Sequence, residues 1–163
     1  LEALAIVADS AETLEVLRQE LGFAEGGASA IRAPKRSTQR KLRIWRTLRG
    51  DRIVVGRNAR ENDWITFSVA RPDDTWLHAR GLAGAHVIIQ WAGPEDPQVL
   101  ERAAALAAWY SEGREGTHVA VDVTRRRDVR RIPGAAPGLV RYRNERTLHV
   151  RPRSPEELGL LEG

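Results

Sequence analysis

Cysteine and methionine are absent from the 163 residues, and lysine supplies only two of the 26 basic residues. Without cysteine, the chain cannot contain a disulfide, a cysteine-ligated zinc ion or a thiol nucleophile, and this composition favours a cytoplasmic protein. No apolar run approaches the ~20 residues that a membrane-spanning helix needs, and the first residues lack the pattern of a signal peptide. We therefore expect a cytoplasmic chain without a membrane partner.

The start of the chain has the pattern of a segment inside a larger molecule. It begins at Leu1, within a helical pattern, and not at a methionine. A stripe of leucines closed by Gly22 predicts that residues 1–25 are the end of a coiled-coil helix. Residues 26–41 are rich in Gly, Ala, Ser and basic residues, which predicts a flexible basic linker. We therefore expect a piece of a longer protein.

Basic charge is concentrated in the middle of the chain. Residues 1–30 hold six acids and one base, residues 31–153 hold 25 bases and 13 acids, and residues 154–163 hold three acids, which predicts an acidic tail. Guanidinium groups stack on bases and bind phosphate through two parallel hydrogen bonds. The basic body suggests a nucleic-acid partner, while an arginine-rich genome is the alternative explanation of the same composition.

Residues 42–153 carry the patterns of one folded α+β domain. Asn58 is the expected cap of a short helix, and Asp96 followed by a proline is the expected start of a longer, alanine-rich helix. Alternating or β-branched segments predict the strands, at 42–55 (a hairpin), 75–80, 86–91, 119–124, 140–142 and 148–150. We expect a mixed, largely antiparallel sheet of about six strands with two packed helices.

The last two strands are expected to pair with each other. Val140 and Tyr142 would face Leu148 and Val150 across a turn near Asn144. This pairing would gather cations on the opposite face of the hairpin, namely Arg141, Arg143, His149 and Arg151.

Candidate catalytic groups do not form a recognisable site. A metal or hydrolase site would start from His78, His86, Asp63, Asp73 and Asp74, because imidazoles and carboxylates are the ligands and bases available without cysteine. Their spacing matches no metal or hydrolase motif. A strand histidine is more often a hydrogen-bonded structural residue. We therefore expect no enzyme activity, no cofactor and no metal.

Two surfaces are candidates for RNA contact. Alternation along 75–80 places Trp76, His78 and Arg80 on one face, a combination of stacking and cationic groups that suits looped RNA, although Trp76 could equally be a core residue. The second surface is a run of arginines joined by three from the last two expected strands. Its excess of cations suggests phosphate contact and leaves a merely solvated face as the alternative. Its members are Arg125, Arg126, Arg127, Arg130, Arg131, Arg141, Arg143 and Arg151.

The order of five motifs is more specific than any one of them. They are GDRIVVGRNARENDWIT, DDTWLHARGLAGAHVIIQ, the helix ending AAWYSEG, HVAVDVTRRRDVRR and PGAAPGLVRYRNERTLHVRP. Together they resemble the NFACT-R domain across about residues 42–152. NFACT-R is the RNA-binding C-terminal module of the ribosome quality-control family that includes NEMF, Tae2, Caliban and the bacterial RqcH (FbpA-like) proteins.

The resemblance implies a factor that binds the large ribosomal subunit with a stalled peptidyl-tRNA and supports tRNA recruitment for C-terminal tailing. In bacterial members the tails are alanine and the recruited species is alanyl-tRNA. The implied partners are large-subunit RNA, tRNA, and the NFACT-N and coiled-coil domains of the same full-length protein. Family motif residues fall on Gly56, Arg57, Asn58, Asn62, Asp63, Asp74, Trp76, His78, Gly84, His86, Val87, Arg130 and Arg131.

A second class of function stays open beside RNA binding. Some bacterial members carry a fibronectin-binding name, so a fragment of an extracellular-matrix adhesin is the alternative. The absent signal-peptide pattern counts against it. An RNA-modifying or RNA-cleaving enzyme is a third possibility and lacks a credible active site.

Overall fold

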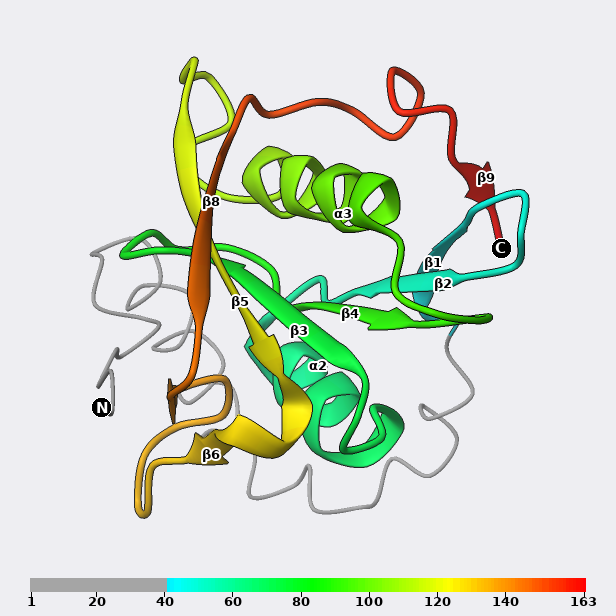
Figure 1. Ribbon diagram of the computed structural model, residues 1–163. Helices are drawn as coiled ribbons and strands as arrows, with labels where there is room; N and C mark the ends of the chain where they lie inside the picture. Colours follow the sequence, from blue (N-terminus) through cyan, green and yellow to red (C-terminus); the bar gives the residue numbers. More distant parts are fainter. Residues whose placement is uncertain (1–40) are drawn as a thin grey trace.

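The computed structural model describes residues 41–163, so the expected coiled-coil end and nearly all of the expected linker lie outside the described residues. A seven-stranded sheet has the order β8-β5-β3-β4-β2-β1-β9, and a separate two-stranded sheet pairs β6 with β7 (Figure 1). Every strand pair is antiparallel. The strands are β1 (Arg43–Arg46), β2 (Arg52–Val55), β3 (Thr75–Ala79), β4 (Val87–Gln90), β5 (Val119–Arg125), β6 (Val129–Arg131), β7 (Val140–Tyr142), β8 (Arg146–Val150) and β9 (Leu161–Glu162).

Helix α3 (Pro97–Trp109) covers one face of the large sheet (Figure 1). Asp96 caps it by accepting a hydrogen bond from the backbone N–H of Gln98, and Pro97 occupies the first turn, where its missing N–H costs nothing. All five of its alanines are buried, and small side chains let the helix axis approach the sheet closely. The main core lies between α3 and the sheet.

A second layer covers the other face of the sheet. It consists of α2 (Ala59–Trp64), the π-helix η3 (Ile65–Val69), the 3-10 turn η4 (Arg126–Asp128) and the β6–β7 ribbon. Its buried residues form a distinct cluster around Trp76. Because both faces of the sheet are covered, all five residues of β3 are buried.

The α+β class, the mainly antiparallel sheet and the two packed helices are confirmed. The expected hairpin between 140–142 and 148–150 is wrong. Residues 140–142 pair with 129–131, while 146–150 pair with 119–123 at the edge of the large sheet. Arg141 therefore lies opposite Arg130 and not beside His149.

The segment 154–163, expected to be an acidic tail, packs on the domain. Leu158 and Leu160 are buried in the main core, and β9 adds a short strand beside β1. Within residues 41–163, neither α-helix has the length and apolar character that crossing a bilayer would require.

Candidate nucleic-acid interface

Trp76, His78 and His86 lie in the core and not on an open surface. Trp76 and His86 are 0% exposed and His78 is 1% exposed. The expectation that one face of this strand remains free for RNA is wrong, because the second layer covers that face. A base cannot stack on the Trp76 ring in this conformation, since stacking needs an accessible ring face.

A donor-only group fixes the protonation of His86. The indole Nε1–H of Trp76 donates to His86 Nδ1 at 3.2 Å, and the hydroxyl of Thr66 lies 2.9 Å from the same nitrogen. Indole can only donate, so Nδ1 accepts and the ring proton lies on Nε2. Burial first, and then the neighbouring His78, hold the pKa of His86 well below its ordinary value. The ring is neutral.

His86 Nε2 has no hydrogen-bond partner among the described residues. The Gly138 backbone acts to raise the pKa of His86, but it does not reach Nε2 with the geometry of a hydrogen bond. A buried N–H without an acceptor lowers stability. Among the described residues, the hydrogen bonds of the imidazole ring are therefore made at Nδ1 alone.

Side-chain hydrogen bonds also link His78 to the loop before β4, and β5 to β7 and β8. Burial lowers the pKa of His78 to about 4, and its Nε2 lies 3.2 Å from the carbonyl of Gly84. Asp122 accepts hydrogen bonds from the hydroxyls of Tyr142 at 2.6 Å and Thr147 at 2.7 Å. The guanidinium of Arg80 lies 3.4 Å from Asp122, and half of the Arg80 side chain is exposed. Of the three residues expected to contact RNA from this strand, Trp76 and His78 are buried and Arg80 reaches solvent.

Asn58 and Asn62 have structural roles. Asn58 Oδ1 accepts from the N–H of Glu61 at 2.8 Å and caps α2, as its position predicts. Asn62 Oδ1 accepts from the N–H of His86 at 3.0 Å, and its amide lies 3.4 Å from the carbonyl of Gly84. The side chain thus ties α2 to the loop before β4.

Arg57 and Asp63 are each engaged in a two-pronged ion pair. The guanidinium of Arg57 donates to both carboxylate oxygens of Glu61, at 2.9 and 2.7 Å. The guanidinium of Arg131 donates to both oxygens of Asp63, at 3.0 and 2.9 Å. Hydrogen bonding to Asp63 raises the pKa of Arg131. The arginine side chains of the two pairs are 33% and 58% exposed, so solvent screens the attraction and each pair contributes modestly to folding.

Two guanidinium groups lie on the ring of Phe67. Those of Arg126 and Arg131 are 4.8 and 4.3 Å from its centroid, and Arg126 Nε donates to the carbonyl of Thr66 at 2.6 Å. Burial, followed by the charges of Arg131 and Arg130, lowers the pKa of Arg126. No carboxylate within residues 41–163 forms an ion pair with Arg126, whereas Arg131 is paired with Asp63. The two guanidinium groups on Phe67 therefore retain one uncompensated positive charge.

Arg130 and Arg141 lie directly opposite each other on β6 and β7. Both are exposed, and in the described part of the chain neither has a carboxylate partner. Like charges at directly paired strand positions destabilise a sheet, and a bound anion removes that penalty. The geometry therefore favours an anion between the two side chains.

The other expected arginines divide into paired and unpaired groups. Arg127 forms an ion pair with Asp73, and Arg143 lies 3.8 Å from Asp128. Arg125 is exposed and has no ion pair with any described residue. We define the arginine surface as the cations that lie around Phe67 and across the β6–β7 ribbon, namely Arg126, Arg130, Arg131 and Arg141.

Phe67 lies beneath two cations, a position that the amino-acid pattern around it does not indicate. Four large apolar residues occupy 64, 65, 67 and 69, a spacing that does not follow one helical stripe. The structure accommodates this spacing with a π-helix, which turns Ile65 inward and leaves Phe67 partly exposed. Within 41–163, no group of three or more histidines and carboxylates has the arrangement of a metal site.

The model of the NFACT protein RNA binding domain family matches residues 40–137. The Rqc2 homolog RqcH of Bacillus subtilis is 38% identical over 111 residues, covering 68% of this chain and 19% of that protein. The Rqc2 homolog RqcH of Streptococcus pneumoniae is 35% identical over 146 residues, covering 88% of this chain and 26% of that protein. The chain thus spans about a fifth to a quarter of the length of these relatives.

A solved structure supports the same relationship. The C-terminal of the fibronectin/fibrinogen-binding protein from Streptococcus suis (FBPS) superimposes with a TM-score of 0.69 and 29% identity, over 90% of this chain and 60% of that one. The family match alone extends over more than half of the chain. By sequence and by fold, the chain belongs to the NFACT protein RNA binding domain family.

Proposed function

We propose that this domain binds RNA through the arginine surface. The observation that carries the proposal is the opposed pair Arg130 and Arg141, two exposed cations with no carboxylate partner in the described chain. Arg126 and Arg131 extend the same positive region over Phe67. Clustered guanidinium groups bind successive phosphates and release counterions, which gives affinity without requiring base-edge contacts.

We further propose that the full-length protein acts in ribosome-associated quality control. The similarity to proteins named Rqc2 homolog RqcH supports this assignment. In this proposal the domain contacts large-subunit RNA or tRNA beside a stalled peptidyl-tRNA, and other domains of the protein help recruit alanyl-tRNA for C-terminal tailing in the cytoplasm. The domain contributes binding and performs no chemistry, which is consistent with the burial of His78 and His86 away from any substrate.

The experiment is an RNA titration of the 163-residue chain across a salt series. The double variant Arg130→Glu and Arg141→Glu should bind weakly, and the slope of log affinity against log salt should fall by about 0.7–0.9 for each phosphate that the protein no longer neutralises. The double variant Arg46→Glu and Arg153→Glu changes the charge equally at exposed positions on other parts of the domain and should keep most of the affinity. Equal reductions of affinity in the two variants would mean that only net charge matters.

The name of the Streptococcus suis neighbour supports one alternative, binding of fibronectin or fibrinogen. A pull-down of the same variants with fibronectin tests it. Fibronectin binding that survives in the Arg130/Arg141 variant while RNA binding disappears would assign the two activities to different surfaces. Tight fibronectin binding together with a flat RNA salt series would replace the RNA proposal.

A further inference from the structure

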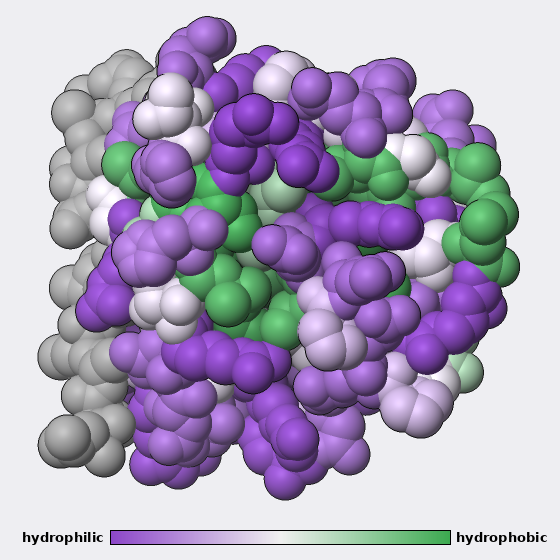
Figure 2. Space-filling model, turned by 45° about the horizontal axis from the view of Figure 1, so that its top comes forward, coloured by the Kyte–Doolittle hydropathy of each residue, from purple (hydrophilic) through white to green (hydrophobic). Residues whose placement is uncertain are grey.

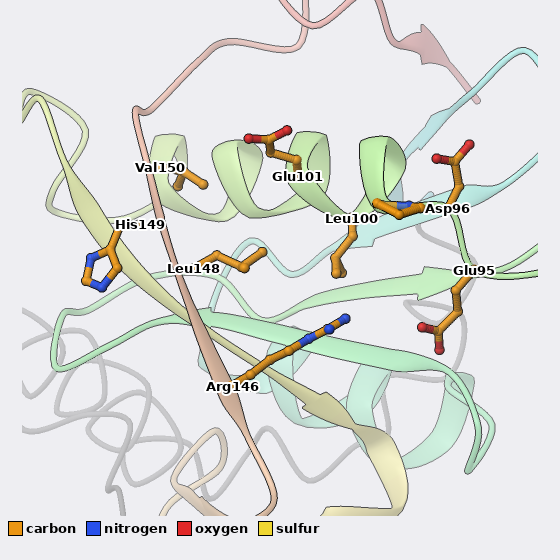
Figure 3. A pocket seen from close by; sticks show the side chains of 9 residues that line it. Glu95, Asp96, Leu100, Glu101, Arg146, Leu148, His149 and Val150 are labelled. Atoms are coloured by element: carbon orange, nitrogen blue, oxygen red, sulfur yellow. The ribbon is translucent and has the colours of Figure 1, made fainter.

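Strand β8 is an edge of the large sheet with an open groove beside it. Among residues 41–163 it pairs with β5 only, so one row of its backbone N–H and C=O groups has no strand partner. Unpaired edges of this kind accept an additional strand. The side chains of Leu148 and Val150 point toward α3, whereas His149 points away (Figure 3). The groove is therefore on the α3 side of the sheet.

The groove contains two adjoining hollows with opposite charge. The acidic hollow has a volume of about 420 Å³ and lies beside Leu148, with Leu100 providing apolar surface. Its carboxylates, which come from the first turns of α3 and the loop before it, are Glu95, Asp96 and Glu101. Arg146 extends into this hollow from β8 but forms no ion pair within 4.0 Å (Figure 3). The hollow retains a negative excess.

The basic hollow has a volume of about 380 Å³ and lies beside Val150, where β8 ends. Its cations are Arg102, Arg151 and Arg153, and none of them forms an ion pair with a described residue. They outnumber its single carboxylate, Glu101, which lines both hollows. Apolar surface lies between hydrophilic groups on the face that is turned forward in Figure 2. A ligand for this groove needs an apolar part as well as charges of both signs.

We propose that β8 binds an extended polypeptide as an additional antiparallel strand with an acidic residue two positions before a basic one. Residues two apart on a strand share a face at a spacing of about 7 Å. Leu148 and Val150 have this spacing. Leu148 lines the acidic hollow only, whereas Val150 lies where the two hollows adjoin and lines the basic hollow as well. In a peptide that runs antiparallel to β8, the residue opposite Val150 precedes the residue opposite Leu148. The acidic residue of the peptide therefore meets the arginines of the basic hollow, and the basic residue two positions later enters the acidic hollow.

The charge distribution favours a peptide over RNA at this groove. Three carboxylates in the acidic hollow would repel phosphate groups. A nucleic-acid strand also lacks the regular alternation of N–H and C=O groups by which another β-strand pairs with the free edge of β8. The antiparallel direction follows from the sheet, in which every existing pair is antiparallel. This site is separate from the arginine surface, so its existence does not depend on RNA binding there.

The test compares two labelled heptapeptides of equal composition by fluorescence anisotropy. Thr-Thr-Glu-Val-Arg-Thr-Thr should bind about tenfold more tightly than Thr-Thr-Arg-Val-Glu-Thr-Thr, because only the first order matches both hollows. Proline in place of the central valine should abolish binding, since it removes a backbone donor. Hydrogen exchange at the amides of β8 should slow when the first peptide is present.

A charge-reversed protein gives the second arm. Glu95→Lys with Glu101→Lys should lower the affinity for the Glu-Val-Arg peptide by about tenfold. The same variant should bind a Glu-Val-Glu peptide, which the unchanged protein should reject. The matched control, Glu115→Lys with Glu156→Lys, reverses two exposed carboxylates outside the groove and should change neither affinity. Equal affinity for both peptide orders, or an unaffected Glu95/Glu101 variant, would overturn the proposal. Single-stranded RNA that displaces the peptide from the unchanged protein, and that no longer binds the groove in the Arg102→Glu with Arg151→Glu variant, would also overturn the proposal. It would assign the groove to nucleic acid.

Discussion

The indole N–H of Trp76 points at Nδ1 of His86 at 3.2 Å, with the two rings nearly perpendicular at 84°. Trp76 comes from β3 and His86 from the residue before β4, so this bond crosses two neighbouring strands in the second core layer. It gives the tryptophan a polar role that a packed ring alone would not have. Burial and hydrogen bonding therefore explain this aromatic–histidine pair without a bound ligand.

Trp76→Phe should reduce the free energy of unfolding by about 1–3 kcal/mol, because it leaves the buried acceptor on His86 with fewer donors. Trp76→Ala should cost about 3–5 kcal/mol, the range for removing a large buried ring. Denaturant melts measure both changes. RNA affinity of the folded Trp76→Phe protein should be unchanged, whereas a loss of affinity at nearly constant stability would show that the ring contacts RNA.

The fold could be predicted from the sequence where its signals were local. Asn58 and Asp96 cap their helices as expected, since capping depends on residues within one turn. The partner of residues 140–142 could not be obtained in the same way. The nearest strand in sequence suggested a hairpin, but Val140 and Tyr142 bury their side chains in the second layer by pairing with β6.

The candidate site was predictable only in part for a related reason. Alternation correctly assigned Trp76 and His78 to one side of β3, but alternation cannot tell whether that side is open. It is covered by Val129 and Tyr142, which lie more than fifty residues further along the chain. The arginine run was visible in composition alone, whereas its arrangement around Phe67 depends on the π-helix and on the β6–β7 ribbon.

Stability should fall when the pH is lowered from about 6.5 toward 4. The pKa of His78 is about 4 in the folded protein, below its ordinary value of 6.5. Between these values the unfolded chain binds more protons, so stability rises with pH and this contribution is complete above 6.5. The loss on acidification is roughly 3 kcal/mol for His78. His86 adds to it, because its pKa is depressed as well.

Unfolding curves at a series of pH values measure this dependence. His78→Gln should flatten the slope between pH 6.5 and 4, because the protonatable ring is gone. His118→Gln is the control, since His118 is exposed and has no hydrogen bond or ion pair among the described residues. An unchanged pH slope in His78→Gln would mean that His78 is protonated without unfolding.

Gly56→Ala should destabilise the domain well beyond an ordinary glycine substitution. An added Cβ would collide with Oδ1 of Asn62, the atom that accepts from the N–H of His86. Moving Asn62 would leave that buried N–H without a partner, which costs about 1–3 kcal/mol in addition to the steric strain. Gly134→Ala is the control, because a Cβ there has nothing within 4 Å and meets only the penalty of a φ of +78°, about 1–2 kcal/mol. Similar melting temperatures for the two variants would contradict the role assigned to Asn62.

Asp63→Asn should raise RNA affinity, in contrast to most changes in a binding site. Asp63 neutralises Arg131 through two hydrogen bonds, and Asn retains one acceptor while removing the negative charge. The arginine surface would then gain one unit of positive charge with little change in folding, since the Arg131 side chain is 58% exposed and solvent screens the pair. Affinity should increase by a few-fold at low salt, and the salt slope should steepen by about 0.7–0.9 if Arg131 then binds a phosphate.

Asp128→Asn, which removes the negative charge from the longer Arg143–Asp128 pair, is the matched control and should have a smaller effect. RNA titrations in a salt series decide the matter: weaker binding by Asp63→Asn would mean that the carboxylate itself contacts RNA, and unchanged binding would place the RNA away from Arg131.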